Sequence, residues 1–336
     1  MAAGRMSIPG FVSAHSHAFQ RSLRGRGGGG DFWAWREAML VEAGRQTPDA
    51  VRAGYAQTYR EMRAAGYTAV GEFHYLGLPE ALAAAEAAHA AGIEMVLLLA
   101  AYERGGLPRF RQASVREYLN GLERLREAGA RVGLAPHSVR ACSASWLTEI
   151  GHYATREGLV LHVHACEQPR EIDECLAEHG VRPVELLARC GCLGPSTTVV
   201  HATHAGPAEL DLLAEAGATV CLCPTTEANL GDGFPPLQGL LERRIRLAIG
   251  SDSNVRIDPL EELRELEGTA RRQAGRREVI ELEELLAIGS RNGAAALGLA
   301  SWGDTEVNLA HPLLAGVAPA DAPAALVFSC SADVFA

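Results

Sequence analysis

The sequence has no long hydrophobic run and no recognisable export signal. Its longest apolar stretch, residues 95–101, falls far short of the roughly 20 residues that a membrane-spanning helix needs. Residues 1–7 contain no apolar segment of the kind found in secretory signal peptides. We therefore expect a cytoplasmic protein that has no membrane partner.

Positive charge is also scarce. The 31 Lys and Arg residues are outnumbered by 41 Asp and Glu residues, which gives a formal net charge of -10. An acidic balance of this size argues against nucleic acid, or an anionic membrane surface, as the main partner. A small-molecule substrate is therefore the expected ligand.

Zinc-finger cysteine pairs and a phosphate-binding loop are missing as well. The eight cysteines include Cys190-Gly-Cys192 and Cys221-Leu-Cys223, whose spacings differ from those of zinc fingers. Reduced, mostly buried thiols are the simplest interpretation in a cytoplasmic protein. The glycine tract 25–30 is not followed by the Lys-Ser/Thr pair of a phosphate-binding loop, so we expect it to be a flexible connection.

The sequence does contain a regular alternation of short apolar runs and helical stretches. Hydrophobic residues make up 48% of the 336 residues, which is enough for a sizeable core. The expected strands are 8–12, 68–73, 94–101, 131–135, 159–164, 198–201, 219–223 and 245–250. The expected helices are 47–65, 79–91, 114–128, 143–157, 170–189 with a break near Gly180, and 207–216, followed by long charged helices to residue 299. This alternation predicts an α/β protein, a (β/α)8 TIM-type barrel over residues 7–300.

Histidines and carboxylates cluster at the ends of the expected strands. His15 and His17 follow the first strand, and side chains at positions i and i+2 of a strand point the same way. His164 and Glu167 belong to the end of the fifth strand, His201 to the sixth and Asp252 to the eighth. Active sites of such barrels lie at the C-terminal strand ends, so we expect these groups to converge on a catalytic divalent metal.

Each of these histidines also has an ordinary interpretation. An isolated His-x-His after a strand is about as often a pair of surface residues, and His162 is expected to alternate away from His164. The metal hypothesis depends on the recurrence of such groups at the same end of four strands.

Several segments are similar to a known family. The His-x-His pair, the histidines of strands five and six and the Asp of strand eight resemble the amidohydrolase superfamily of metal-dependent hydrolases. More narrowly, six segments resemble the formimidoylglutamate deiminases of histidine degradation: His15-Ser-His-Ala-Phe-Gln-Arg21, Phe32-Trp-Ala-Trp-Arg36, Gly71-Glu-Phe-His-Tyr75, Ala135-Pro-His-Ser-Val-Arg140, Cys223-Pro-Thr-Thr-Glu-Ala-Asn-Leu-Gly-Asp-Gly233 and Gly250-Ser-Asp-Ser253. The likeness extends from about residue 9 to residue 299, and the second and fifth segments are its most specific parts.

The resemblance implies a metal site, a set of catalytic residues and a substrate. The implied metal ligands are His15, His17, His164 and Asp252, with one divalent ion expected to be zinc. The implied catalytic residues are Glu167, His201 and Asp252, and the implied substrate contacts are Gln20, Arg36, Tyr75, His137 and Arg140. The reaction would be hydrolysis of N-formimidoyl-L-glutamate to N-formyl-L-glutamate and ammonia. How the proton transfers are divided among the three catalytic residues stays open.

The residue chemistry fits a dicarboxylate substrate. Arg36 and Arg140 can each bind a carboxylate bidentately, although arginines in loops more often form solvated ion pairs. We interpret Trp33 and Trp35 as a wall that fixes Arg36. Residues 224–233 are expected to form a loop that covers the metal, and Cys166 to be a small buried thiol rather than a nucleophile.

The chain departs from the superfamily pattern at both ends. Members usually carry a small β-sandwich built from segments before and after the barrel, but only fourteen residues precede His15. The usual C-terminal strands are hard to identify after Trp302. We therefore expect the sandwich to be largely missing, and we interpret residues 301–336 as a tail left from it.

Three functions compete at this point. The first is formimidoylglutamate deimination. The second is another deaminase or cyclic-amide hydrolase of the same superfamily, acting on an imidazolone or an aminated ring, which leaves Arg36 and Arg140 unexplained. The third is an inactive truncated barrel that only binds a ligand. Association as a homodimer is left open.

Overall fold

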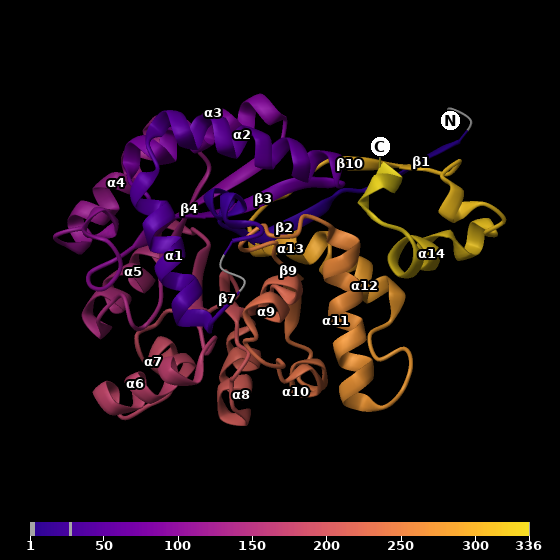
Figure 1. Cartoon of the computed structure of the whole chain (residues 1–336). Coiled ribbons are helices and arrows are strands. Elements are labelled where there is room, and N and C mark those ends of the chain that lie inside the picture. Colours follow the sequence, from indigo (N-terminus) through magenta and orange to yellow (C-terminus); the bar gives the residue numbers. More distant parts are fainter. Residues whose placement is uncertain (1–3, 27–28, 336) are drawn as a thin grey trace.

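Eight parallel strands form a barrel, which confirms the predicted fold (Figure 1). The computed structural model describes residues 4–26 and 29–335, so residues 27–28 of the glycine tract lie outside the described residues. The barrel strands are β2 (Phe11–Ser16), β3 (Tyr67–His74), β4 (Glu94–Ala101), β5 (Val132–Pro136), β6 (Leu161–Ala165), β7 (Thr197–His201), β8 (Thr219–Leu222) and β9 (Arg246–Ile249). They pair in sequence order, and a parallel bridge between Ser16 and Asp252 links the two ends of the sheet.

Helices follow the strands, as the alternation predicts. They are α1 (Phe32–Arg45), α2 (Pro48–Ala64), α3 (Leu78–Ala91), α4 (Val115–Glu127), α5 (Ala144–Glu157), α6 (Pro169–His179), α7 (Pro183–Arg189), α8 (Pro207–Ala216), α9 (Pro224–Leu230), α10 (Leu237–Glu242), α11 (Pro259–Ala274), α12 (Leu282–Ile288), α13 (Arg291–Ala296) and α14 (Ala322–Ser329). Thr47 caps α2, because its side chain accepts a hydrogen bond from the Ala50 amide. Gly180, with φ of 69°, ends α6 at the predicted break.

The first apolar run is two strands rather than one. It is divided at Gly10 into β1 (Arg5–Pro9) and β2. Only glycine fits at this position, because a Cβ at Gly10 would lie 2.2 Å from the Thr68 side chain. β1 leaves the barrel and pairs antiparallel with β10 (Asp304–Asn308). The strand that was hard to identify after Trp302 is therefore present, and the structure places this two-stranded sheet beside α14, to the right of the barrel in Figure 1.

Helices α1, α9, α10 and α14 occur where none was expected. α1 follows the glycine tract and begins at Phe32. Asp31 caps it, because its side chain accepts a hydrogen bond from the Ala34 amide. The segment expected as a loop over the metal is α9, a short helix that starts at Pro224 and ends at Gly231 in the left-handed conformation. The loop expectation for 224–233 was therefore wrong for its first seven residues. The sequence does contain the boundary signals of this helix, proline at its first position and glycine after its last.

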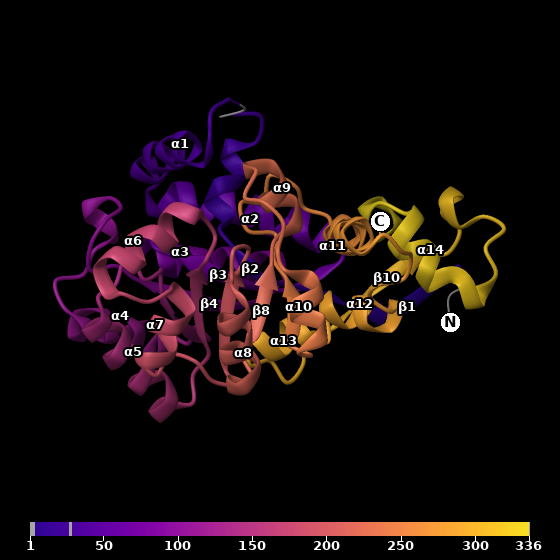
Figure 2. The same ribbon diagram turned by 90° about the horizontal axis from the view of Figure 1, so that it is seen from below.

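α1 and α9 lie at the same end of the barrel, which also carries the polar side chains described below. In Figure 2 both helices lie beyond one end of the strands. Among the residues that the structure describes, no helix combines the length and the apolarity needed to cross a membrane.

Candidate active site

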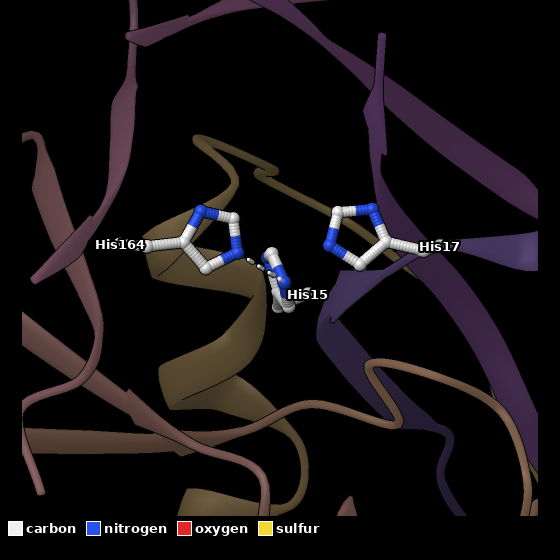
Figure 3. A group of neighbouring side chains, drawn as sticks. All are labelled: His15, His17 and His164. Atoms are coloured by element: carbon white, nitrogen blue, oxygen red, sulfur yellow. Dashed lines mark hydrogen bonds between the residues drawn. The ribbon is translucent and has the colours of Figure 1, made fainter. Parts of the chain in front are cut away.

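Three buried histidines point toward one place at the C-terminal end of the barrel. Figure 3 shows His15 between His17 and His164, with the ring nitrogens facing one another. One ligand atom of each lies within 4.8 Å of the other two, and the Nε2 atoms of His15 and His164 are 3.1 Å apart. The Oδ1 atom of Asp252 lies 3.4 Å from His15 Nε2 and 3.6 Å from His17 Nε2. The structure thus brings the four expected ligands together.

Backbone carbonyls set the orientation of two of these rings. His17 Nδ1 lies 2.8 Å from the carbonyl oxygen of Phe73, and His164 Nδ1 lies 3.0 Å from that of His137. A carbonyl oxygen only accepts, so each Nδ1 carries the hydrogen and each Nε2 keeps its lone pair. The Nδ1 of His15 is buried without a partner among the described residues, so no hydrogen bond on that side fixes its tautomer.

The environment favours neutral imidazoles. Burial, helped by the neighbouring histidines, lowers the pKa of His15 and His164 well below the ordinary value. Burial also lowers the pKa of His17, although Asp252 and the Phe73 carbonyl oppose it. Neutral histidines and a carboxylate are the donors that zinc prefers, so this donor set fits a divalent metal ion.

The backbone near the cluster is tightly constrained. His201 and Asp252 have φ of 71° and 41°, in the left-handed region that non-glycine residues rarely adopt. Asp252 is held there because its amide donates to the His15 carbonyl (3.0 Å) and its carbonyl accepts from the His17 amide (2.8 Å). Gly250 has no room for a side chain, since a Cβ would lie 2.8 Å from the Cβ of His15.

His201 lies among three carboxylates. Its Nε2 is 3.6 Å from Glu167 Oε1 and 3.9 Å from Asp252 Oδ2, and its Nδ1 is 3.1 Å from Glu227 Oε1. Burial lowers the pKa of His201, but Glu167, Glu227 and Asp252 outweigh it and raise the pKa well above the ordinary value. Burial raises the pKa of Glu167, which His201 and Arg140 only partly offset. A raised pKa keeps a carboxyl protonated to higher pH, which is the direction that a general acid requires.

The residues expected to bind substrate line one small cavity, about 50 Å³ in volume, at this end of the barrel. The expected site residues that line this cavity are Gln20, Arg36, Tyr75, His137, Arg140, His17, His164, Glu167, His201 and Asp252. His162 and His204 are directed elsewhere, since each bonds to a backbone carbonyl, of Ala296 and Asp232 respectively. The expectation that His162 alternates away from His164 was wrong, because the two residues are i and i+2 on β6 and share one side of the strand, and His162 also helps to lower the pKa of His15.

α1 closes the cavity with apolar and cationic side chains. Trp35, Arg36 and Met39 of this helix are part of the lining. The Cζ atoms of Arg140 and Arg170 lie 5.8 Å and 4.5 Å from the centre of the Trp33 ring. Trp33 was interpreted as a support for Arg36, but the stacking found among the described residues is with Arg140 and Arg170 instead.

Two residues of the site were missed from the sequence. Tyr102 lines the cavity, and its ring centre is 4.5 Å from that of His137. The signal available for it was its position directly after β4, where a barrel presents functional side chains. Glu227 belongs to the segment 223–233 that resembles the family, but it was not among the expected site residues. Its position in the first turn after Pro224 could have placed it near the barrel mouth.

Glu72 supports the turn that carries His17. Its Oε2 accepts from the Ser16 hydroxyl (3.0 Å) and its Oε1 accepts from the Ala18 amide (2.9 Å). Burial raises the pKa of Glu72 to about 8, although these two hydrogen bonds oppose the shift. The folded protein therefore holds the Glu72 proton more strongly than the unfolded chain does.

This proton makes the free energy of unfolding depend on pH. Because the folded pKa is the higher one, stability from this group is complete below the unfolded value near 4.5 and is lost as the pH rises toward about 8. A tenfold difference in proton affinity between the folded and unfolded states corresponds to about 1.4 kcal/mol. We expect Glu72→Gln to flatten this decline, measured by urea unfolding of metal-depleted protein at several pH values between the two. An unchanged pH slope in Glu72→Gln would contradict the expectation.

Comparisons with known proteins agree with this site. The model of the amidohydrolase family matches residues 6–307. A formimidoylglutamate deiminase from Pseudomonas aeruginosa is 39% identical over 334 residues, which cover 88% of this chain and 73% of that protein. A 5-methylthioadenosine/S-adenosylhomocysteine deaminase from Haloarcula marismortui is 31% identical and covers 88% of this chain and 69% of its own length.

Solved structures share the fold. An amidohydrolase from Brucella melitensis is 30% identical, with a TM-score of 0.84 and coverage of 98% of this chain and 84% of that one. An adenosine deaminase from Xanthomonas campestris with bound zinc has a TM-score of 0.89 at 23% identity, and the match covers 98% of this chain and 78% of that one. At this identity the similarity supports only the fold. With the family model spanning residues 6–307, this chain belongs to the amidohydrolase family and is a hydrolase that acts on carbon–nitrogen bonds.

Proposed function

We propose that this chain hydrolyses N-formimidoyl-L-glutamate to N-formyl-L-glutamate and ammonia, as a step of histidine degradation, and that it uses one zinc ion. The 39% identical relative carries the name of this reaction. The observation that carries the proposal is the pair of guanidinium groups, Arg36 and Arg140, which line the same cavity as His17 and His164.

Both guanidinium groups have capacity left for a ligand. The Nε of Arg140 is buried without a hydrogen-bond partner among the described residues, and its Nη2 lies 4.0 Å from Glu167, the carboxylate found close to it. Arg36 lies 3.5 Å from Glu37, whose side chain is 74% exposed, so that ion pair is weakened by solvent. The two carboxylates of N-formimidoyl-L-glutamate would supply the bidentate partners that these groups lack.

A nucleoside substrate is less compatible with the cavity. Several relatives near 30% identity are deaminases of methylthioadenosine and S-adenosylhomocysteine. An uncharged nucleoside would bury Arg140 and Arg36 without providing a carboxylate for either, which costs free energy. A cyclic amide or an aminated ring with no carboxylate has the same disadvantage.

The proposed residue roles follow from the distances. Bound zinc supplies Lewis acidity and lowers the pKa of a water molecule toward about 7. Asp252 accepts the proton of the attacking water as oxygen adds to the formimidoyl carbon. Glu167, whose pKa is raised by burial, gives a proton to the terminal nitrogen of the protonated formimidoyl group. The bond between that nitrogen and the carbon then breaks, ammonia leaves, and the new hydroxyl group becomes the carbonyl by giving its proton back to Glu167. His201 Nε2, 3.6 Å from Glu167, carries a hydrogen in the charged ring and stabilises the negative charge that develops on the atoms bonded to the tetrahedral carbon.

Ammonia release by the zinc-loaded protein tests the substrate. The panel is N-formimidoyl-L-glutamate, imidazolone propionate, guanine, cytosine and 5-methylthioadenosine. We expect release from the first compound. We also expect Arg140→Met to raise its KM about 10- to 100-fold, because a charge-assisted hydrogen bond contributes about 1.5–3 kcal/mol.

A matched control separates substrate binding from loss of charge. Arg52, in α2, forms surface ion pairs with Asp49 and Glu86, so Arg52→Met removes one cation without altering the cavity. Its KM should stay at the value of the unaltered protein. Ammonia release from methylthioadenosine, with none from N-formimidoyl-L-glutamate, would refute the proposed function.

A further inference from the structure

Glu227 is a buried carboxylate directly behind His201, and the proposed mechanism gives it no part. It belongs to α9, is 3% exposed, and its Oε1 lies 3.1 Å from His201 Nδ1. On the other side of the ring, Nε2 faces Glu167 Oε1 at 3.6 Å and Asp252 Oδ2 at 3.9 Å. The imidazole therefore lies between Glu227 and the two carboxylates of the proposed reaction.

The hydrogen-bond pattern fixes which ring nitrogen carries the hydrogen. Glu227 Oε1 also accepts from the backbone amide of Cys223 at 2.8 Å, so this oxygen acts as an acceptor. His201 Nδ1 is then the donor in the bond to Glu227. Nε2 faces the site as an N–H donor when the ring is charged, and with its lone pair when the ring is neutral. The geometry points to Glu227 as a positioning residue: we propose that it fixes the ring orientation and tautomer of His201 so that Nε2 faces the substrate. This inference rests on the catalytic role proposed for His201.

Glu227 is itself held rigidly. Its amide donates to the Cys223 carbonyl (2.9 Å), and its carbonyl accepts from the Asp232 amide (3.0 Å). These bonds and the first turn of α9 orient its side chain toward β7, which ends at His201. A group oriented in this way can hold the imidazole without reorganising during the reaction.

A second metal ion is the competing interpretation of the same residues. One donor atom from each of His201, Cys223 and Glu227 lies within 4.8 Å of the other two, and all three residues are buried. The hydrogen bond between His201 and Glu227 favours positioning, because it already occupies the Nδ1 atom and the Oε1 atom. Metal analysis of the unaltered protein decides between the two.

Three variants of the zinc-loaded full chain test the role of Glu227. In Glu227→Ala we expect kcat for N-formimidoyl-L-glutamate to fall about 10- to 100-fold, the range found for residues that orient catalytic or metal-bound histidines. KM and zinc content should stay unchanged. Glu227→Gln keeps an acceptor oxygen at the same place, so it should recover most of that loss. The matched control is Glu262→Gln, because the Glu262 carboxylate also anchors α9, through the amide (3.0 Å) and hydroxyl (2.5 Å) of Thr225, but does not touch His201.

Nitrogen-15 NMR of the histidine rings gives a readout that needs no substrate. The His201 signals, assigned with a His201→Asn variant and recorded at a pH at which the ring is neutral, should show hydrogen on Nδ1 in the unaltered protein and in Glu262→Gln, and a mixture of tautomers in Glu227→Ala. If the chain releases no ammonia, the proposed function fails while this measurement still tests the positioning role. Equal kcat losses in Glu227→Ala and Glu262→Gln, an unchanged tautomer in Glu227→Ala, or a second zinc equivalent that Glu227→Ala removes would each overturn the proposal.

Discussion

His17→Gln protein is expected to lose most of its bound metal and to turn over substrate about a thousandfold more slowly or worse. The substitution removes one of three imidazoles whose ligand atoms lie within 4.8 Å of one another. The amide of glutamine is a poor replacement, because zinc prefers imidazole nitrogen and thiolate ligands. Elemental analysis of the purified protein, together with the ammonia assay, measures both effects.

The matched control for this variant is His162→Gln. His162 lies on β6 two residues before His164, is fully buried, and its Nε2 bonds to the Ala296 carbonyl, so it is not one of the clustered ligands. Its replacement removes a buried histidine from the same strand without removing a ligand. Equal losses of metal in the His17 and His162 variants would show that metal content reports folding rather than coordination.

Glu167→Gln is expected to lower kcat about 10²- to 10⁴-fold while the protein keeps its metal. Glu167 does not belong to the group of side chains that could hold the metal, and its Oε1 faces His201 Nε2 at 3.6 Å. An amide at this position can form similar hydrogen bonds but cannot deliver a proton. Single-turnover and steady-state rates of ammonia release, compared at equal zinc content, check this expectation.

A neighbouring carboxylate provides the control. Glu171, in the first turn of α6, is buried and its Oε2 accepts from the Glu167 amide at 3.1 Å. Glu171→Gln preserves an acceptor for that amide, so its kcat should fall by less than about tenfold. A Glu167→Gln protein with unchanged kcat would remove Glu167 from the proposed mechanism.

The barrel could be predicted because most residues of its strands are buried on both faces. The last six residues of β4 (Glu94–Ala101) are all buried, and they appear in the sequence as a short continuous apolar run. Helix boundaries were also visible where a side-chain cap or a terminal glycine occurs, as at Thr47 and Gly180. Apolar runs and capping residues are local features, which can be recognised in a single sequence.

The β1–β10 pair could not be predicted in the same way. Arg5 pairs with Asn308, a partner about 300 residues away in the chain, and the apolar positions are few: Met6 and Ile8 in β1 and Val307 in β10. The missed α1 did leave a signal: the buried residues Phe32, Met39 and Ala43 recur at a helical spacing. Trp33 and Trp35 were interpreted as packing residues beside Arg36, and the helix that contains all three was not predicted.

The site residues were visible as residue types at strand ends, but the contacts between them were not. The sequence could suggest that His15, His17, His164 and Asp252 share one end of the barrel. It could not show that Glu227 lies behind His201, or that Trp33 lies against Arg140 and Arg170. Those contacts depend on how α1, α6 and α9 pack over the barrel mouth.

Anomalous X-ray diffraction at the zinc edge, from crystals of the zinc-loaded chain, tests the central claim most directly. The four side chains described above predict a single strong peak enclosed by His15, His17, His164 and Asp252. If the protein contains one zinc per chain and the peak lies elsewhere, or no peak lies at this position, the account is contradicted.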